Sequence, residues 1–189
     1  IMKKILFTLT LLICFSSFGQ AELDYEEKLK ALVETAYEKY LAGDYISAAA
    51  DYKKITEQYD PKFESSYQFY ISYAWFYSGL IKLDIDAECS NAIIDFNKSI
   101  KLNPSFTPAY NSRATAHICM GNFQEAIDDC EALIKSESND DLIRSAYEQM
   151  ILAKSRLNLD YCSDYKTIKE LKLKLSSSIF EIVDFNNCN

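Results

Sequence analysis

Glycine and proline are scarce in this sequence of 189 residues, which has four Gly, three Pro, one His and one Trp. β-Sandwiches, nucleotide-binding sheets with glycine-rich loops and long linkers all depend on Gly or Pro at their turns. The scarcity therefore argues against these classes and favours long helices with few breaks. Hydrophobic residues make up 49% and charged residues 25% of the chain, which is typical of one folded domain rather than of a disordered chain.

Positive charge is also in short supply. The chain has 20 basic and 28 acidic residues, a formal net charge of -8. Proteins that bind nucleic acid obtain most of their affinity from Lys and Arg at phosphates, so a nucleic-acid partner is disfavoured. The negative charge favours basic protein partners, whose association would weaken with salt.

The first residues have the pattern of an export signal. Lys3 and Lys4 precede the apolar run 5–15, and small residues two apart follow at Ser17 and Gly19. The pattern predicts a signal peptide over residues 1–19 and a periplasmic, cell-envelope or secreted protein. Its removal takes away two Lys, so that the charge of -8 becomes -10 for the mature chain.

Two other interpretations of this segment are weaker. The apolar run is short for a bilayer span and is followed by acidic residues, so a retained membrane helix is disfavoured. Lipidation at Cys14 would require a small residue before the cysteine, where Ile13 stands. We therefore interpret Cys14 as an apolar residue of the removed peptide.

The remaining chain has helical periodicity and a longer repeat. Apolar residues recur at spacings of three and four, as in Leu29, Leu32, Val33, Ala36 and Tyr40. A motif Ala-x-x-Asp then recurs at Ala48, Ala92 and Ala126, and more weakly at Tyr161. Gly43 and Gly121 precede two of these motifs, where Gly can end one helix in a left-handed cap before the next begins.

These residues resemble the tetratricopeptide repeat, a helix-turn-helix unit of about 34 residues with the pattern W-x2-L-G-x2-Y, then A-x3-F, then P. Trp75 and Gly79 are four apart, as in the family. The third unit follows the pattern without a gap, at Arg113, Ala114, His117, Gly121, Phe123, Ala126 and Cys130. In the fourth unit Tyr161 stands where the family has a small residue, so this unit is either an irregular repeat or a terminal cap.

The resemblance implies an all-α fold, a right-handed solenoid of three to four such units with a C-terminal capping helix. The solenoid would cover residues 24–175, with units at about 24–62, 63–104, 107–138 and 141–175, and the cap and tail would cover 177–189. An insert at 63–71 most plainly lengthens the helix that carries Trp75. Its aromatic residues either pack against the 24–41 helix or form an exposed ledge for a ligand.

The resemblance also implies a non-enzymatic scaffold without cofactors, which binds a peptide or a partner helix on a concave face. The first helices of the units would line this face, with Tyr37, Tyr40, Leu41, Tyr73, Phe76, Asn111, Thr115 and Ile118 as partner-binding residues. A small-ligand or glycan receptor, or a self-associating envelope-assembly subunit, remains the alternative. The oligomeric state and the partner stay open.

Export makes disulfides the first interpretation of the five remaining cysteines, at least one of which is free because the number is odd. Cys162 and Cys188 bracket the last helical segment and form one candidate pair. In stacked repeats Cys89 and Cys119 would lie on the same side, and they form the other. Cys130 stands in place of a core aromatic and is predicted to be a buried, inert thiol.

Catalytic and metal sites find little support in the residues. His117, the only imidazole, occupies the place of a core Tyr, so a packing role is favoured over a general base or a metal ligand. Asp128 and Asp129 are adjacent and diverge on a helix, which prevents joint binding of a metal. Asp129 is in register with Asp51, Asp95 and Asp164, and this recurrence favours a structural role such as a cap or an inter-repeat contact.

Overall fold

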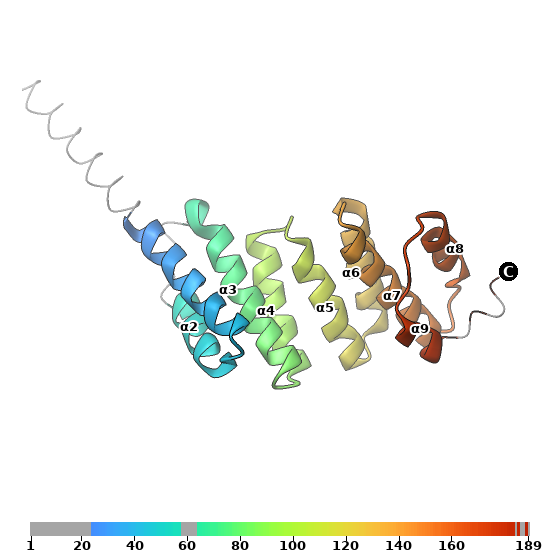
Figure 1. Cartoon of the computed structure of the whole chain (residues 1–189), viewed down its shortest axis with the longest axis horizontal. Helices are drawn as coiled ribbons and strands as arrows, with labels where there is room; N and C mark the ends of the chain where they lie inside the picture. The colour runs from blue at the N-terminus through green and yellow to red at the C-terminus, as the bar shows by residue number, and fades with distance from the viewer. Residues whose placement is uncertain (1–23, 58–63, 184, 186–187, 189) are drawn as a thin grey trace, which may run out of the picture. The chain divides into compact units, whose positions relative to one another are not determined.

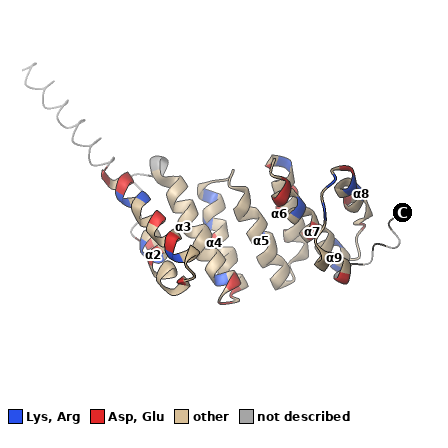
Figure 2. Ribbon diagram, viewed as in Figure 1, with Lys and Arg blue, Asp and Glu red and all other residues tan. Residues whose placement is uncertain are grey.

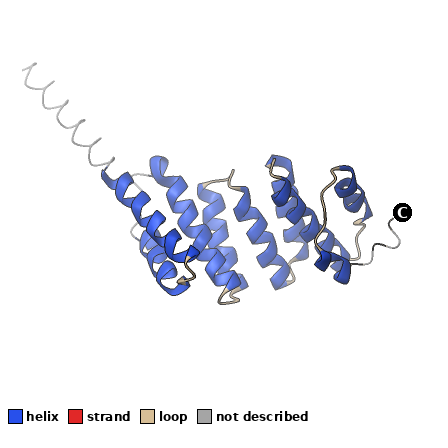
Figure 3. Cartoon of the chain, viewed as in Figure 1, coloured by secondary structure: helices blue, strands red, loops and turns tan. Residues whose placement is uncertain are grey.

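The computed structural model describes residues 24–57, 64–183, 185 and 188. Regular structure in these residues is helical, without a strand (Figure 1, Figure 3). The chain divides into two compact parts, one up to Ala74 and one from Trp75 on. The predicted all-α class is confirmed. The predicted signal peptide, with Cys14, lies outside the described residues.

The N-terminal part contains a helical hairpin and the start of a third helix. Residues 24–41 are helical, and α2 (Tyr45–Glu57) follows after a short turn. Gly43 in this turn has a φ of 79°, a left-handed conformation that Gly adopts without the steric cost of a Cβ. This confirms the glycine turn predicted there. The apolar stripes of the helices form the buried core, with Leu29, Val33, Ala36, Ala48, Tyr52 and Ile55.

Helix α3 (Glu64–Asp84) is longer than the other helices whose bounds are complete. It has 21 residues, whereas α5 (Thr107–Met120) has 14, so the predicted lengthening is confirmed. Within the N-terminal part, Tyr67 is buried and its ring lies 5.2 Å from that of Tyr25 on the 24–41 helix. Phe69 is 53% exposed on another face. The insert therefore both packs against the 24–41 helix and exposes an aromatic ring.

The C-terminal part is a series of packed helices, namely α4 (Cys89–Leu102), α5, α6 (Phe123–Ser136), α7 (Asp140–Arg156), α8 (Cys162–Glu170) and α9 (Ser177–Ile182). From α4 to α8 each helix packs against the next, and α5 also packs against α7. This pattern is typical of stacked helix-turn-helix units. We call α3–α4, α5–α6 and α7–α8 the second, third and fourth hairpins, and the helices at 24–57 the first hairpin.

Helix ends in this part are defined by local backbone chemistry. Gly121, with a φ of 75°, ends α5, and its N–H donates to the carbonyls of His117 and Ile118. Ala87 and Asn158 are also left-handed, at φ 53° and 56°, so each turn inside the second to fourth hairpins contains one such residue. Asn139 is the N-cap of α7, and its side chain accepts hydrogen bonds from the N–H groups of Asp141 and Leu142.

The chain end covers the fourth hairpin. Buried apolar residues of α7, α8, α9 and the segments on both sides of α9 form one cluster, consisting of Ile151, Ile168, Leu175, Ile179 and Val183. Phe185 extends it by stacking on Tyr165, with 4.3 Å between the ring centroids. The apolar surface that the last repeat would otherwise expose is thus buried, which is the function of a terminal cap.

Candidate functional site

The four recurring aspartates all form ion pairs between the two helices of their hairpins. Each partner is a cation from the first helix: Lys39 for Asp51, Lys82 for Asp95, Arg113 for Asp129 and Lys154 for Asp164. The three lysines stand two residues before the end of their helices, which end at 41, Asp84 and Arg156. The role is structural, as predicted. Each ion pair joins the two helices of one hairpin, so it is neither a helix cap nor a contact between repeats.

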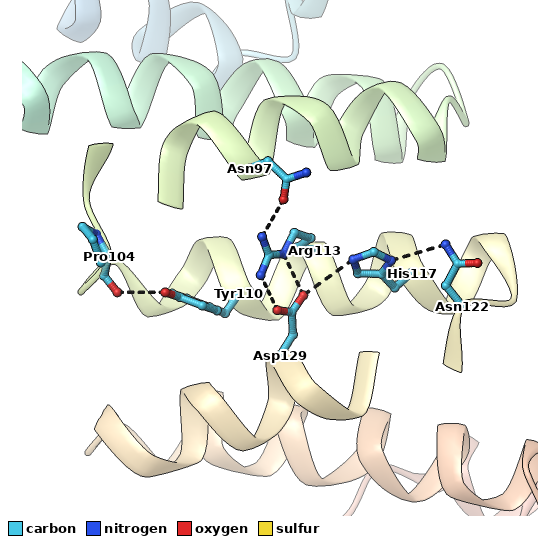
Figure 4. Close-up of polar contacts among 7 residues, drawn as sticks. All are labelled: Asn97, Pro104, Tyr110, Arg113, His117, Asn122 and Asp129. Carbon is cyan, nitrogen blue, oxygen red and sulfur yellow. Dashed lines mark hydrogen bonds and ion pairs between the residues drawn. The ribbon is translucent and has the colours of Figure 1, made fainter. Parts of the chain in front are cut away.

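The third hairpin has the most elaborate of these contacts (Figure 4). Arg113 Nε donates to Asp129 Oδ2 at 2.8 Å, and Nη2 donates to Oδ1 of the same carboxylate. Its remaining nitrogen Nη1 reaches Asn97 of α4 in the second hairpin. Arg113 therefore joins three helices through a bidentate ion pair, a geometry that a lysine cannot provide.

His117 lies beside this ion pair. Its Nε2 is 4.0 Å from Asp129 Oδ2, and its Nδ1 is 3.5 Å from Asn122 Nδ2. Burial lowers the pKa of His117 below its ordinary value of 6.5, although the Asp129 carboxylate opposes this shift. Burial thus favours the neutral form of the imidazole, and its contacts are those of a packing residue.

A polar face spans α5 and α7, the first helices of the third and fourth hairpins. Gln149 Nε2 donates to Asn111 Oδ1 at 2.9 Å and to Ser145 Oγ at 3.1 Å. The hydrogen bond fixes the amide of Asn111, whose Nδ2 makes no hydrogen bond to another described residue. Asn111 was predicted as a partner-binding residue, whereas Gln149 was not. The 3.6-residue period that places Ser145 and Gln149 on one face of α7 could have indicated it.

The other predicted residues on α5 differ in exposure. Thr115 is exposed, and its hydroxyl donates to the carbonyl of Asn111 at 3.2 Å. Ile118 is half-buried and packs against the core cluster of the third hairpin. Asn111, Thr115 and Ile118 thus lie on one helix, where Thr115 is exposed and the other two are half-buried.

In the N-terminal part, aromatic rings cluster near the end of the 24–41 helix. The rings of Tyr37 and Tyr40 stack at 6.5 Å, and Tyr40 meets Tyr45 edge-on at 5.5 Å. Tyr37 is 38% and Leu41 is 65% exposed, so both offer surface to a partner. Tyr73 lies elsewhere in this part, on α3, where its ring is 4.6 Å from that of Phe69.

Phe76 does not offer a binding surface, and its assignment to the groove is wrong. The side chain is 7% exposed and belongs to the core between α4 and α5. Its ring lies 4.9 Å from that of Phe106, which comes from the connector between the second and third hairpins. This connector covers a residue that the resemblance to the repeat family placed on the concave face.

The five cysteines among the described residues form two disulfides and leave one thiol. Cys89 is bonded to Cys119, with 6.3 Å between their Cα atoms, and Cys162 to Cys188, with 5.0 Å. These are the two pairs considered from the sequence. Two disulfides are typical of a protein that folds in an oxidising compartment. Cys130 is buried, and burial raises the pKa of its thiol far above the ordinary value.

The described residues contain neither a metal-binding cluster nor a membrane-spanning helix. His, Cys, Asp and Glu side chains in the described part of the chain form no group of three that could hold a metal ion. Every helix in the described ranges is too short or too polar to cross a bilayer.

Comparisons with known proteins assign no family. No protein-family model matches the chain. Protein FlbA of Caulobacter vibrioides is 30% identical over 73 residues, 37% of this chain and 12% of FlbA, so the chain spans about an eighth of this relative. Two crystal structures of MamA are similar. One has 22% identity and a TM-score of 0.47, over 72% of this chain and 95% of MamA. The other has 20% and 0.44, over 78% and 97%.

Proposed function

We propose that the protein is an exported, non-enzymatic scaffold of the tetratricopeptide-repeat type that binds an extended segment of a partner protein across α5 and α7, two first helices of its C-terminal part. The observation that carries this proposal is the amide pair Asn111–Gln149, which links the first helices of two consecutive hairpins at 2.9 Å. An extended peptide exposes unpaired carbonyl and N–H groups along its backbone, and a fixed amide can bind one of them.

The chemistry of this face favours peptide binding over catalysis. With Asn111 Oδ1 held by Gln149, Asn111 Nδ2 is the group positioned to donate to a backbone carbonyl of the ligand. Thr115, exposed one turn further along α5, adds a small polar surface next to it. His117, the one imidazole of the sequence, is engaged in packing beside the Arg113–Asp129 pair.

The aromatic surface of the N-terminal part supplies apolar contacts of the kind that dominate interface energetics. Tyr37 and Leu41 are exposed four residues apart on one helix face. Tyr side chains combine a large apolar area with a hydroxyl and lose little rotamer entropy on binding. We include Tyr37, Tyr40, Leu41 and Tyr73 in the binding surface of the N-terminal part and omit Phe76.

Peptide selection tests this proposal. Peptides are selected from a random library on the immobilised mature protein, and the Kd of a synthesised hit is measured by fluorescence anisotropy. We expect Asn111→Ala to weaken binding by about tenfold or more, because a positioned hydrogen bond is lost. Ile94→Ala is the matched control, since Ile94 is 51% exposed on the second helix α4. Equal affinity of the two variants would exclude the α5–α7 face.

Export belongs to the same proposal, because the disulfides fit an oxidising compartment. Expression of the chain with and without residues 1–19 in a bacterium tests it. We expect the longer form to be found in the periplasm or medium with a mature N-terminus at Gln20. Retention in the cytoplasm with the first 19 residues intact would contradict export.

Self-association is a second candidate, and the exposure of Phe69 favours it. This ring is 53% exposed and lies 5.6 Å from the ring of Tyr70. Light scattering of the mature protein and of Phe69→Ser separates the candidates. A dimer that dissociates in the variant supports a self-associating subunit, and a monomer in both cases excludes it.

A further inference from the structure

One edge of the C-terminal part exposes apolar side chains that its core does not use. The turns inside the second, third and fourth hairpins lie along the lower edge of this part in Figure 1. These turns, with the last residue of α5, expose Ile85 by 50%, Met120 by 49%, Leu157 by 39% and Leu159 by 46%. The connectors 103–106 and 137–139 expose no large apolar side chain to a comparable degree. Turns normally favour Gly, Asn, Asp and Ser, so this concentration calls for a partner.

A disulfide holds two of these turns together. Cys89 is the first residue of α4 and Cys119 the second-last of α5, and their Cα atoms are 6.3 Å apart. Ile85 lies four residues before Cys89, and Met120 directly follows Cys119. The covalent bond therefore fixes Ile85 and Met120 in neighbouring turns. A surface fixed before binding loses less conformational entropy when a partner docks.

Negative charge surrounds Ile85. Asp84, Asp86 and Glu88 are all exposed, and residues 83–97 contain no Lys or Arg. Figure 2 colours the ribbon by charge and shows red at the turn between α3 and α4. None of the three carboxylates forms an ion pair with a described residue. The nearest cation in sequence, Lys82, is bound to Asp95 instead. We call the surface made of Asp84, Ile85, Asp86, Glu88 and Met120 the acidic turn edge.

The pKa of Asp84 is consistent with the lack of a cation beside this carboxyl. Partial burial raises the pKa of this carboxyl, with no neighbouring positive charge to oppose the shift. By contrast, the Lys39 hydrogen bond lowers the pKa of Asp51, one of the paired aspartates of the hairpins. A Lys or Arg side chain of a partner at the turn edge would pair with Asp84 as Lys39 pairs with Asp51.

We propose that the acidic turn edge binds a basic amphipathic segment of a partner protein. Apolar side chains of this segment cover Ile85 and Met120, and its Lys or Arg side chains pair with the surrounding carboxylates. Charge complementarity selects this occupant, because the same carboxylates repel an anionic lipid surface. The surface is formed by turns and differs from the helix face at Asn111, so it provides a second docking site.

A synthetic probe tests the proposal on the intact, oxidised mature protein. The probe is a fluorescein-labelled amphipathic peptide of Leu and Lys, and its binding is followed by anisotropy. We expect saturable binding that the same pattern of Leu and Glu does not show. Ile85→Ser with Met120→Ser is expected to weaken binding by about tenfold. Asp84→Asn with Asp86→Asn is expected to weaken it by about fivefold and to reduce its salt dependence.

A matched control separates local docking from the attraction of any cation to an acidic protein. Glu131→Gln with Glu170→Gln removes the same charge from exposed positions of α6 and α8. We expect this variant to bind like the parent protein, with helical content and disulfides intact in every variant. Equal weakening by both neutralised pairs would overturn the proposal. Binding to phosphatidylglycerol vesicles without competition from the Leu and Lys peptide would also overturn it, in favour of a membrane.

Discussion

Gly79 of α3 lies directly against the ring of Phe96 on α4. A Cβ at Gly79 would come within 2.7 Å of Phe96 Cε1, closer than packed carbon atoms approach. In the third hairpin the corresponding residues are Ala114 and Cys130, both buried. Cys130 thus has a small thiol where Phe96 has a ring, and Ala114 has a methyl group where Gly79 has only a hydrogen. In the second hairpin Gly79 and Phe96 thus share a limited volume, which the phenylalanine ring fills.

Gly79→Ala tests this shared volume. Alanine favours the helix by about 1 kcal/mol, whereas overpacking a core typically costs about 1–3 kcal/mol. Because Phe96 is fully buried, we expect a net loss of roughly 1 kcal/mol in the free energy of unfolding, measured with urea. Phe96→Leu should reduce the cost of the added methyl. Strictly additive effects of the two changes would contradict a direct clash.

The Arg113–Asp129 pair should be important for stability. Their side chains are 19% and 6% exposed, so Arg113→Ala leaves the Asp129 carboxylate buried without its cation. We expect a loss of about 3 kcal/mol on denaturant unfolding. The control is Lys30→Ala, which breaks an exposed pair with Glu34 and should cost less than about 1 kcal/mol. Similar losses in the two variants would show that burial does not determine how much unfolding free energy is lost when an ion pair is broken.

Acidification should destabilise the protein through His117. Burial lowers the folded-state pKa below 6.5, so the folded state binds fewer protons than the unfolded state in this range. This contribution to stability is complete above about pH 6.5 and is lost as the pH falls through the lowered pKa. His117→Gln should flatten the pH dependence of the unfolding free energy in that window. NMR titration of the single imidazole measures the pKa, and a value above 6.5 would reverse the predicted sign.

The two disulfides and the buried thiol predict the mass of the oxidised protein and the reactivity of its cysteines. Two disulfides require the mature protein to weigh four hydrogens less than its reduced form. Iodoacetamide should modify Cys130 only after unfolding, because the thiol is 1% exposed and burial raises its pKa. Replacing Cys89 and Cys119 by Ser should lower the unfolding free energy by roughly 3.5 kcal/mol through loop-closure entropy. Rapid alkylation of the native protein would contradict the buried position.

The sequence predicted the features that depend on local periodicity. Apolar spacing and the glycine positions predicted the helices and the turns at Gly43 and Gly121. The register of Asp51, Asp95, Asp129 and Asp164 predicted a common structural role. Their cations were not predicted, because Lys39, Lys82 and Lys154 are placed relative to the end of a helix rather than to the motif. In the third hairpin the cation is Arg113, which lies more than one helical turn further from the end of its helix than the three lysines do.

The assignment of partner-binding residues was less reliable. The resemblance to the repeat family placed Phe76 on the concave face, but Phe106 in a connector packs against its ring. A connector has no period, so the sequence pattern carries no information on what it covers. Gln149 was missed for a related reason, since its importance depends on Asn111, a residue 38 positions away. Contacts between repeats are set by stacking rather than by the pattern of one repeat.

The disulfide between Cys89 and Cys119 has a mechanical consequence. Repeat arrays can unravel one unit at a time when pulled from their ends, because each unit contacts only its neighbours. This bond joins the second hairpin to the third across 30 residues of sequence. Roughly 100 Å of chain is therefore excluded from extension under tension. Tension along the chain then passes from Cys89 to Cys119 through the disulfide and bypasses α4 and the part of α5 before Cys119, whereas α3 and α6 remain open to extension.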